Sequence, residues 1–236
     1  MKKKLFFTYA LLATTLFIQA QDENNYRTPW YGVIGLRSNS VKYVNSLTSV
    51  KSSLVYGEIS DVNFANKTFL DVGIPFGGYL LRLLITRKVG TDYTKSEVPF
   101  LYIKGGYDIV KAGKVKIGLG ASASSVWMQN LPTEMEGYSK LKYGTVSPLV
   151  YAKINLGKFL VTPVFEYNVV SWTDNSKIKR SGFSFGSYVI VPISGKFAIN
   201  INPYYERGKF KSSSENILNV TSSNLACKIG LVVNFD

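Results

Sequence analysis

Residues 146–169 read VSPLVYAKINLGKFLVTPVFEYNV, and apolar residues recur there at every second position on both sides of a short turn. Side chains alternate between the two faces of a β-strand, so each half predicts a strand with one apolar face. In the second half, one face carries Phe159, Val161, Pro163, Phe165, Tyr167 and Val169, and the other carries Leu160, Thr162, Val164, Glu166 and Asn168. The turn at 156–158 joins the halves into a predicted antiparallel hairpin.

Tight turns and long polar connections alternate through the C-terminal part of the chain. This alternation is typical of a closed barrel that crosses a membrane, with short turns on one side and long loops on the other. The expected strands are 100–110, 115–126, 146–156, 159–169, 182–193, 197–207 and 224–235. The expected long connections lie at about 128–144, 171–181 and 208–221.

Upstream, the alternation predicts a strand at 79–86 that leads into a basic loop at 87–97. We also assign one strand around 30–37 and one long or broken strand within 54–74, with a kink near 63–66. These assignments predict ten strands, with both chain termini on the side of the short turns. Eight or twelve strands are the alternatives, because single-chain bacterial barrels have even strand numbers.

The predicted fold is therefore all-β, a closed antiparallel up-and-down transmembrane β-barrel of about ten strands. A soluble β-sandwich is the alternative. Its strands average about 5–6 residues, whereas strands that span a membrane need about 9–11. Gly118, Gly120, Ser122 and Ser124 would also lie on an exposed face of a sandwich. In a narrow barrel, such small inward residues leave space for large side chains across the lumen.

The first 20 residues predict a cleaved secretory signal, which leaves residues 21–236 as the barrel domain. Lys2, Lys3 and Lys4 precede an uncharged run from Leu5 to Ile18, and Ala20 has the small side chain that suits the cleavage site. A membrane-anchoring helix is the alternative, but the apolar run is shorter than the roughly 20 residues that span a bilayer.

The chain is basic, with a net charge of +13 that falls to +10 without the signal segment. An excess of basic residues is compatible with binding to nucleic acid, with binding to an anionic membrane surface, or with a lumen that prefers anions. Export argues against nucleic acid as a partner. The single cysteine, Cys227, cannot form an internal disulfide and stands in a strand beside Leu225 and Ile229, which predicts a buried or lipid-facing apolar role.

The last residues, Gly230 to Asp236, alternate apolar side chains and place the aromatic Phe235 next to the end. The chain here resembles the small outer-membrane β-barrel family of Gram-negative bacteria, whose last strand ends in an aromatic residue that the barrel-assembly machinery recognises. The resemblance covers the architecture of residues 21–236, and Asp236 after Phe235 departs from the commonest form. It implies an outer-membrane location with periplasmic termini, and it implies no particular activity.

Aromatic residues near the expected strand ends are candidates for the two interfacial girdles of such a barrel, with ordinary packing as the alternative. They are Trp30, Tyr79, Tyr107, Trp127, Phe159, Trp172, Phe183, Phe197 and Tyr205.

The alternation also identifies charged residues that face the predicted lumen. They are Arg82, Lys104, Asp108, Lys116, Lys153, Glu166, Glu206 and Lys228, with Glu58 and Asp71 as further candidates from the less certain region. Charges in a low-dielectric lumen must pair, form hydrogen bonds or stay hydrated. The residues therefore predict either a salt-bridge network that fills the barrel or a narrow hydrated path that prefers anions, and a barrel of this size excludes a wide pore.

Basic residues cluster in the four expected long loops. These clusters comprise Arg87, Lys88 and Lys95; Lys140 and Lys142; Lys177, Lys179 and Arg180; and Arg207, Lys209 and Lys211. They are candidates for binding the phosphates of outer-membrane lipid and of lipopolysaccharide. Plain solvated loops are the alternative.

The sequence predicts no catalytic residue, cofactor or metal site. The chain has no histidine, which excludes Ser-His and Asp-His catalytic arrangements. Residues 118–123 imitate a dinucleotide-binding motif, but strand alternation continues where that motif requires a helix. We expect a non-enzymatic, side-chain-filled barrel that presents basic loops to glycolipid or to a protein partner. The alternative is a narrow porin-like channel for small anionic or polar solutes.

Overall fold

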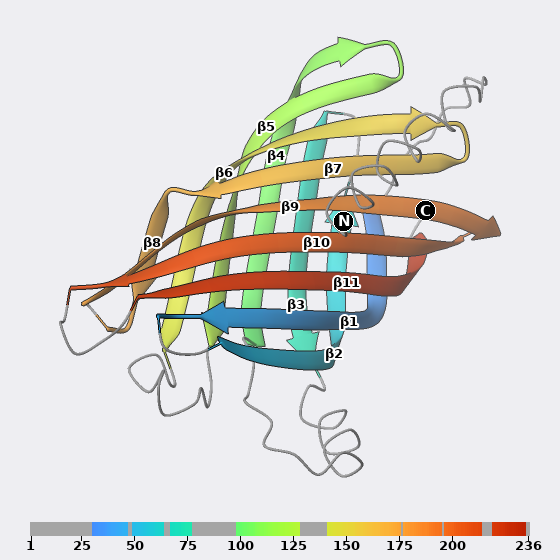
Figure 1. Cartoon of the computed structure of the whole chain (residues 1–236). Coiled ribbons are helices and arrows are strands. Elements are labelled where there is room, and N and C mark those ends of the chain that lie inside the picture. The colour runs from blue at the N-terminus through green and yellow to red at the C-terminus, as the bar shows by residue number, and fades with distance from the viewer. Residues whose placement is uncertain are drawn as a thin grey trace, which may run out of the picture.

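The computed structural model describes residues 30–46, 49–63, 67–76, 98–127, 141–175, 177–194, 196–213 and 219–234, and this part of the chain is almost entirely β-strand. The strands are β1 (Trp30–Val44), β2 (Ser49–Asn63), β3 (Thr68–Phe76), β4 (Val98–Ala112), β5 (Val115–Trp127), β6 (Lys142–Leu156), β7 (Phe159–Asn168), β8 (Val170–Thr173), β9 (Ile178–Ser194), β10 (Phe197–Ser212) and β11 (Val220–Asn234). Figure 1 shows them wrapped around a common interior.

The sheet closes on itself because β1 pairs with both β2 and β11, antiparallel in each case. The short strand β8 pairs with β6 in line with β7, so β7 and β8 occupy one position in the ring. The ring therefore passes through ten strands, and each strand pairs with its neighbours in the sequence. The predicted closed antiparallel up-and-down barrel of ten strands is confirmed.

The strands in the N-terminal part of the chain differ from those predicted. The first strand, predicted at 30–37, continues to Val44. The single strand predicted within 54–74 is wrong, because β2 and β3 are two separate strands that pair with each other in antiparallel orientation. The strand predicted at 79–86 lies outside the described residues. Since β3 pairs directly with β4, the ring is complete without it.

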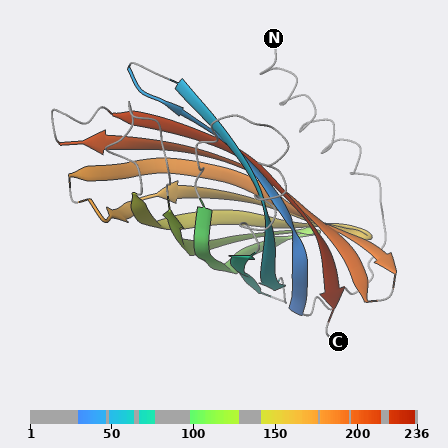
Figure 2. The same ribbon diagram turned by 90° about the horizontal axis from the view of Figure 1, so that it is seen from below.

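Tight hairpins link β4 to β5 and β6 to β7, as predicted. Gly113 and Gly157 adopt φ angles of 57° and 69° there, a left-handed conformation in which a side chain would be strained. These turns lie at the rim where β1 begins and β11 ends, which we call the turn rim; the opposite end is the loop rim (Figures 1 and 2).

At the loop rim the strands extend further than the sequence predicted. The expected connection at 171–181 is wrong, because residues 170–173 form β8 and β9 begins at Ile178. Similarly, β6 begins at Lys142, β10 continues to Ser212 and β11 begins at Val220. The strict alternation of short turns with long loops in the C-terminal part fails for the same reason: only residues 174–177 separate β8 from β9.

The outer surface of the barrel is apolar over much of its height. Ile34, Leu119, Phe165 and Ile229 are exposed, whereas their sequence neighbours face the interior. No helix among the described residues is long and apolar enough to cross a membrane.

The small residues predicted to face the lumen accommodate a tyrosine. Gly118 of β5 is the register partner of Tyr151 of β6, and a Cβ atom at Gly118 would overlap the Tyr151 ring and the Tyr107 carbonyl oxygen. The glycine therefore allows Tyr151 to lie flat across the neighbouring strand and fill the interior.

We predict that Gly118→Ala lowers the free energy of unfolding by about 1–3 kcal/mol, because the new methyl group overpacks a filled interior. Gly105→Ala is the matched control. Its Cβ would meet its nearest atoms at 3.6 Å, an ordinary contact, so its effect should stay within about 0.5 kcal/mol. Urea unfolding in phospholipid vesicles measures both variants, and equal losses would contradict the assigned packing.

Candidate functional site in the lumen

The half of the lumen nearer the turn rim is closed by apolar side chains. Phe69 is almost fully buried, with its ring centroid 5.1 Å from that of Tyr151 and 5.5 Å from that of Tyr188. This turn-rim cluster comprises Val33, Val62, Phe69, Leu149, Tyr151, Val164, Tyr188, Ile190, Ala198 and Val232, with Leu160 packed against it. The interdigitated rings exclude water from this part of the lumen.

The middle of the lumen is organised around Glu58 of β2. Its Oε2 lies 2.6 Å from Nε of Arg37, and its Oε1 lies 2.8 Å from Nζ of Lys228. The hydroxyl of Tyr102 donates a hydrogen bond of 2.6 Å to Oε1. Arg37 and Lys228 are direct register partners on β1 and β11, so this carboxylate offsets the repulsion between two adjacent cations.

Asp71 of β3 is fully buried beside this group. Its Oδ2 accepts a hydrogen bond from the hydroxyl of Tyr188, and its Oδ1 lies 3.3 Å from the Tyr102 hydroxyl. Tyr102 thus contacts the carboxylates of both Asp71 and Glu58. Hydrogen bonds from two tyrosines reduce the cost of burying a carboxylate away from water.

A second ion pair joins two strands that are three positions apart in the ring. Lys104 of β4 pairs with Glu166 of β7, and the hydroxyl of Ser122 donates to the other carboxylate oxygen at 2.5 Å. The Lys104 ammonium lies 5.1 Å from the ring centroid of Tyr204. Because β4 and β7 are not neighbours in the ring, this pair crosses the lumen.

A third ion pair lies toward the turn rim. Nζ of Lys153 is 3.1 Å from Oδ2 of Asp108 and donates a hydrogen bond of 2.5 Å to the carbonyl oxygen of Thr68. The hydroxyl of Tyr151 donates to Asp108 at 2.7 Å. The cation of β6 is thereby held against the backbone of β3, on the other side of β4 and β5.

Arg180 and Glu206 form the ion pair nearest the loop rim. The Arg180 guanidinium lies 4.7 Å from the ring centroid of Tyr143 and 5.6 Å from that of Phe210. Both rings belong to a loop-rim cluster of buried apolar residues, Val41, Tyr43, Leu141, Tyr143, Ile178, Phe210 and Val220, with Val126 packed against it. Apolar clusters therefore lie on both sides of the charged layer.

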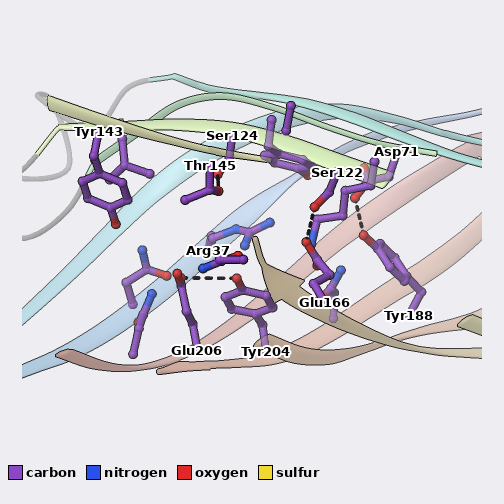
Figure 3. A pocket seen from close by; sticks show the side chains of 18 residues that line it. Arg37, Asp71, Ser122, Ser124, Tyr143, Thr145, Glu166, Tyr188, Tyr204 and Glu206 are labelled. Carbon is purple, nitrogen blue, oxygen red and sulfur yellow. Dashed lines mark hydrogen bonds and ion pairs between the residues drawn. The ribbon is translucent and has the colours of Figure 1, made fainter. Parts of the chain in front are cut away.

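A polar cavity of about 80 Å³ lies between the charged layer and the loop-rim cluster. Figure 3 shows that its wall is formed by tyrosines, hydroxyl groups and carboxylates from strands on all sides of the barrel. Asn39, Asn168 and Asn224 also line it, and each is largely buried. Because a water molecule needs about 10–15 Å³ of such space, the cavity is large enough for a few water molecules.

Among the described residues, five cations and five acids lie in or beside the ion pairs of the lumen, and the half-buried Lys116 adds a sixth cation. The five cations are Arg37, Lys104, Lys153, Arg180 and Lys228, and the five acids are Glu58, Asp71, Asp108, Glu166 and Glu206. The sequence did not place Arg37 and Arg180 inside. Arg37 is the last residue of the strand predicted at 30–37 and shares the inward parity of Val33, so alternation alone would have identified it. Arg180 continues the inward parity of β9, so alternation extended to the true start of that strand would have identified it.

The remaining predicted lumen residues have different outcomes. Lys116 is half-buried near the turn rim, where it is the register partner of Lys153. Arg82 lies outside the described residues. The structure gives the positions of the lumen charges, whereas a functional role for them stays a prediction.

Most of the predicted basic loop residues that the structure describes belong to strands. Arg180 is corrected from a loop cation to a buried residue of β9. Lys142, Lys179, Lys209 and Lys211 are exposed, but they lie on β6, β9 and β10 rather than in loops, because those strands extend beyond their predicted ends. Lys177 lies in the connection before β9. Arg87, Lys88, Lys95, Lys140 and the C-terminal Phe235 lie outside the described residues.

No protein-family model matches the chain, and no curated protein matches it. The solved structures that resemble it are outer-membrane β-barrel proteins of Gram-negative bacteria. They include the outer membrane protease OmpT from Escherichia coli (10% identity, 91% of this chain and 99% of that chain covered, TM-score 0.39). They also include OprG from Pseudomonas aeruginosa (10% identity, 91% and 99% covered, TM-score 0.36) and Neisserial surface protein A (15% identity, 87% and 97% covered, TM-score 0.29). At these TM-scores, the similarities carry no argument about activity.

We predict that Glu166→Leu destabilises the barrel by about 3–5 kcal/mol, because it leaves the Lys104 ammonium in the lumen without its carboxylate. The double variant Glu166→Leu/Lys104→Met should recover most of this loss, since it removes both charges together. Urea unfolding of the wild type and the variants, with Lys104→Met completing the cycle, gives the coupling energy. Additive single effects would show that the two side chains do not interact.

Proposed function

We propose that this protein is a non-conducting, non-enzymatic β-barrel of the outer membrane that acts through its surface. The observation that carries the proposal is the filled lumen, in which paired charges lie between two apolar clusters. The proposal retains the function favoured by the sequence, with outer-membrane lipid, lipopolysaccharide or another protein as the partner.

The outer face of β10 supports a membrane location. Its outward residues are apolar or aromatic from Phe197 to Tyr205 and then become basic at Arg207. This apolar length matches the roughly 9–11 residues that a tilted strand needs to span the hydrocarbon core. Ring closure also gives hydrogen-bond partners to the backbone N–H and C=O groups of the edge strands, which an open sheet in lipid would leave unpaired.

The proposed orientation places the loop rim at the cell surface and the turn rim in the periplasm. Bacterial barrels have short periplasmic turns and longer extracellular connections. The tight turns at Gly113 and Gly157 and both ends of the strand ring lie together at the turn rim. In this orientation, the first strand begins on the periplasmic side after the proposed signal segment. The barrel-assembly machinery would recognise the C-terminal end of the last strand from the same side.

The proposal assigns the buried carboxylates to structure rather than catalysis. Glu58, Glu166 and Asp108 are each held by a cation and by at least one hydroxyl donor. A general acid or base needs access to a substrate, whereas these groups are already engaged within the lumen. The lack of histidine in the sequence supports the same view.

We predict that the purified protein carries no steady current in a planar bilayer at any applied voltage, because apolar clusters close both ends of the charged layer. Single-channel recording, with insertion verified by labelling, measures this directly. Steady anion-selective currents that diminish in Lys104→Gln and Lys153→Gln would overturn the proposal and support the porin-like channel.

We further predict that, in a Cys227→Ser background, Ser213→Cys reacts with a membrane-impermeant maleimide on intact cells and Lys158→Cys does not. The two positions are both exposed and lie at the loop rim and the turn rim, respectively. Lys158→Cys should react only after the outer membrane is permeabilised. Labelling of Lys158→Cys alone on intact cells would invert the orientation.

A further inference from the structure

We propose that the outer wall of the barrel at the loop rim, across β9, β10, β11 and β1, binds the phosphate groups of a glycolipid in the surrounding leaflet. The inference rests on the proposed orientation and names the partner of that surface. The surface, which we call the basic wall, comprises the exposed residues Lys42, Lys177, Lys179, Arg207, Lys209 and Lys211.

Strand register brings these cations together from distant parts of the sequence. Lys211 of β10 is the direct register partner of Lys179 of β9. Lys209 is the next outward-facing residue of β10, on the side of Lys211 that is farther from the loop rim. Arg207 is the partner of Ser223, which is in turn the partner of Lys42. Neighbouring strands lie about 4.8 Å apart and alternate residues along a strand about 7 Å apart, so a phosphate group has room to contact two or three cations at once.

The strand faces that carry the basic wall have no counter-charges among their described residues. Among the described residues that face outward on β1, β9, β10 and β11, none is Asp or Glu, and no described residue forms an ion pair with the six cations. Directly opposed like charges such as Lys179 and Lys211 destabilise a strand pair. An anion that binds between them removes this repulsion.

An aromatic band fixes the height of the basic wall relative to the membrane. Phe183 stacks on Phe165 at 6.3 Å between ring centroids and lies 6.3 Å from Tyr205. Phe183 is also the register partner of Arg207, so the band and the lowest cation are neighbours. Aromatic girdles lie at the boundary between hydrocarbon and headgroups, and the cations beyond them therefore lie at the level of the headgroup phosphates.

This placement favours a lipid over a soluble partner. The cations point outward from the barrel wall, in line with the lipid-facing residues of the same strands, rather than into the lumen. A glycolipid beside the barrel can lay its acyl chains on Leu225 and Phe185, which are exposed below, while its phosphates reach the cations. Clusters of Lys and Arg at this level attract anionic headgroups.

The test measures binding of purified bisphosphorylated lipid A to the full-length mature protein in detergent by native mass spectrometry. The informative variant is Lys179→Gln/Lys209→Gln/Lys211→Gln. The matched control is Lys67→Gln/Lys111→Gln/Lys158→Gln, which removes the same charge from exposed positions toward the turn rim. We expect the first variant to bind lipid A at least tenfold more weakly and the control to bind within twofold of wild type.

Three results would overturn the inference: equal binding of dephosphorylated lipid A, equal losses in the two triple variants, or wild-type affinity in the first variant. Inorganic phosphate is included as a competitor, and displacement of lipid A by millimolar phosphate would assign the site to free phosphate instead. Circular dichroism verifies the strand content of each variant. The bilayer recordings remain independent, because a silent barrel without lipid binding rejects only this inference, whereas conduction rejects the proposed function.

Discussion

The structure depends on the pairing of β1 with β11, which turns a sheet into a closed ring. Fourteen consecutive residue pairs, from Tyr31 with Asn234 to Val44 with Thr221, form this seam. The seam removes the two free edges that a sheet in lipid could not leave unpaired. It also brings Arg37 beside Lys228, so ring closure itself creates the cation pair that Glu58 neutralises.

Ten strands enclose a lumen that side chains from opposite walls can span. Lys104 therefore reaches Glu166, and Tyr188 reaches Asp71, across the interior. Each buried charge is compensated by a group from another strand, as required where water is scarce. The apolar clusters at the two sides of this layer complete a wall-to-wall packing that resembles a protein core more than a pore.

The basic wall illustrates how an error in strand length changes a functional interpretation. The sequence shows Lys179, Lys209 and Lys211 near Ser, Asn and Gly, which predicted long solvated loops. In the structure, β9 and β10 remain paired in register past these residues, as far as Ile178 and Ser212. The same lysines thus become a fixed array on the barrel wall, and Arg180 of the same segment turns into the lumen.

The sequence by itself determined the barrel and the face on which most residues lie, because alternation is a local property of each strand. It reached a total of ten strands only by including a strand at 79–86, outside the described residues, in place of a separate β2 and β3. It did not separate β2 from β3, since the residues at 63–66 are compatible with either a kink or a turn. Only the tertiary structure decided which charges meet. Partners such as Lys153 and Asp108, or Arg37 and Glu58, are set by the stagger between strands and by the width of the closed ring, and no single strand encodes these quantities.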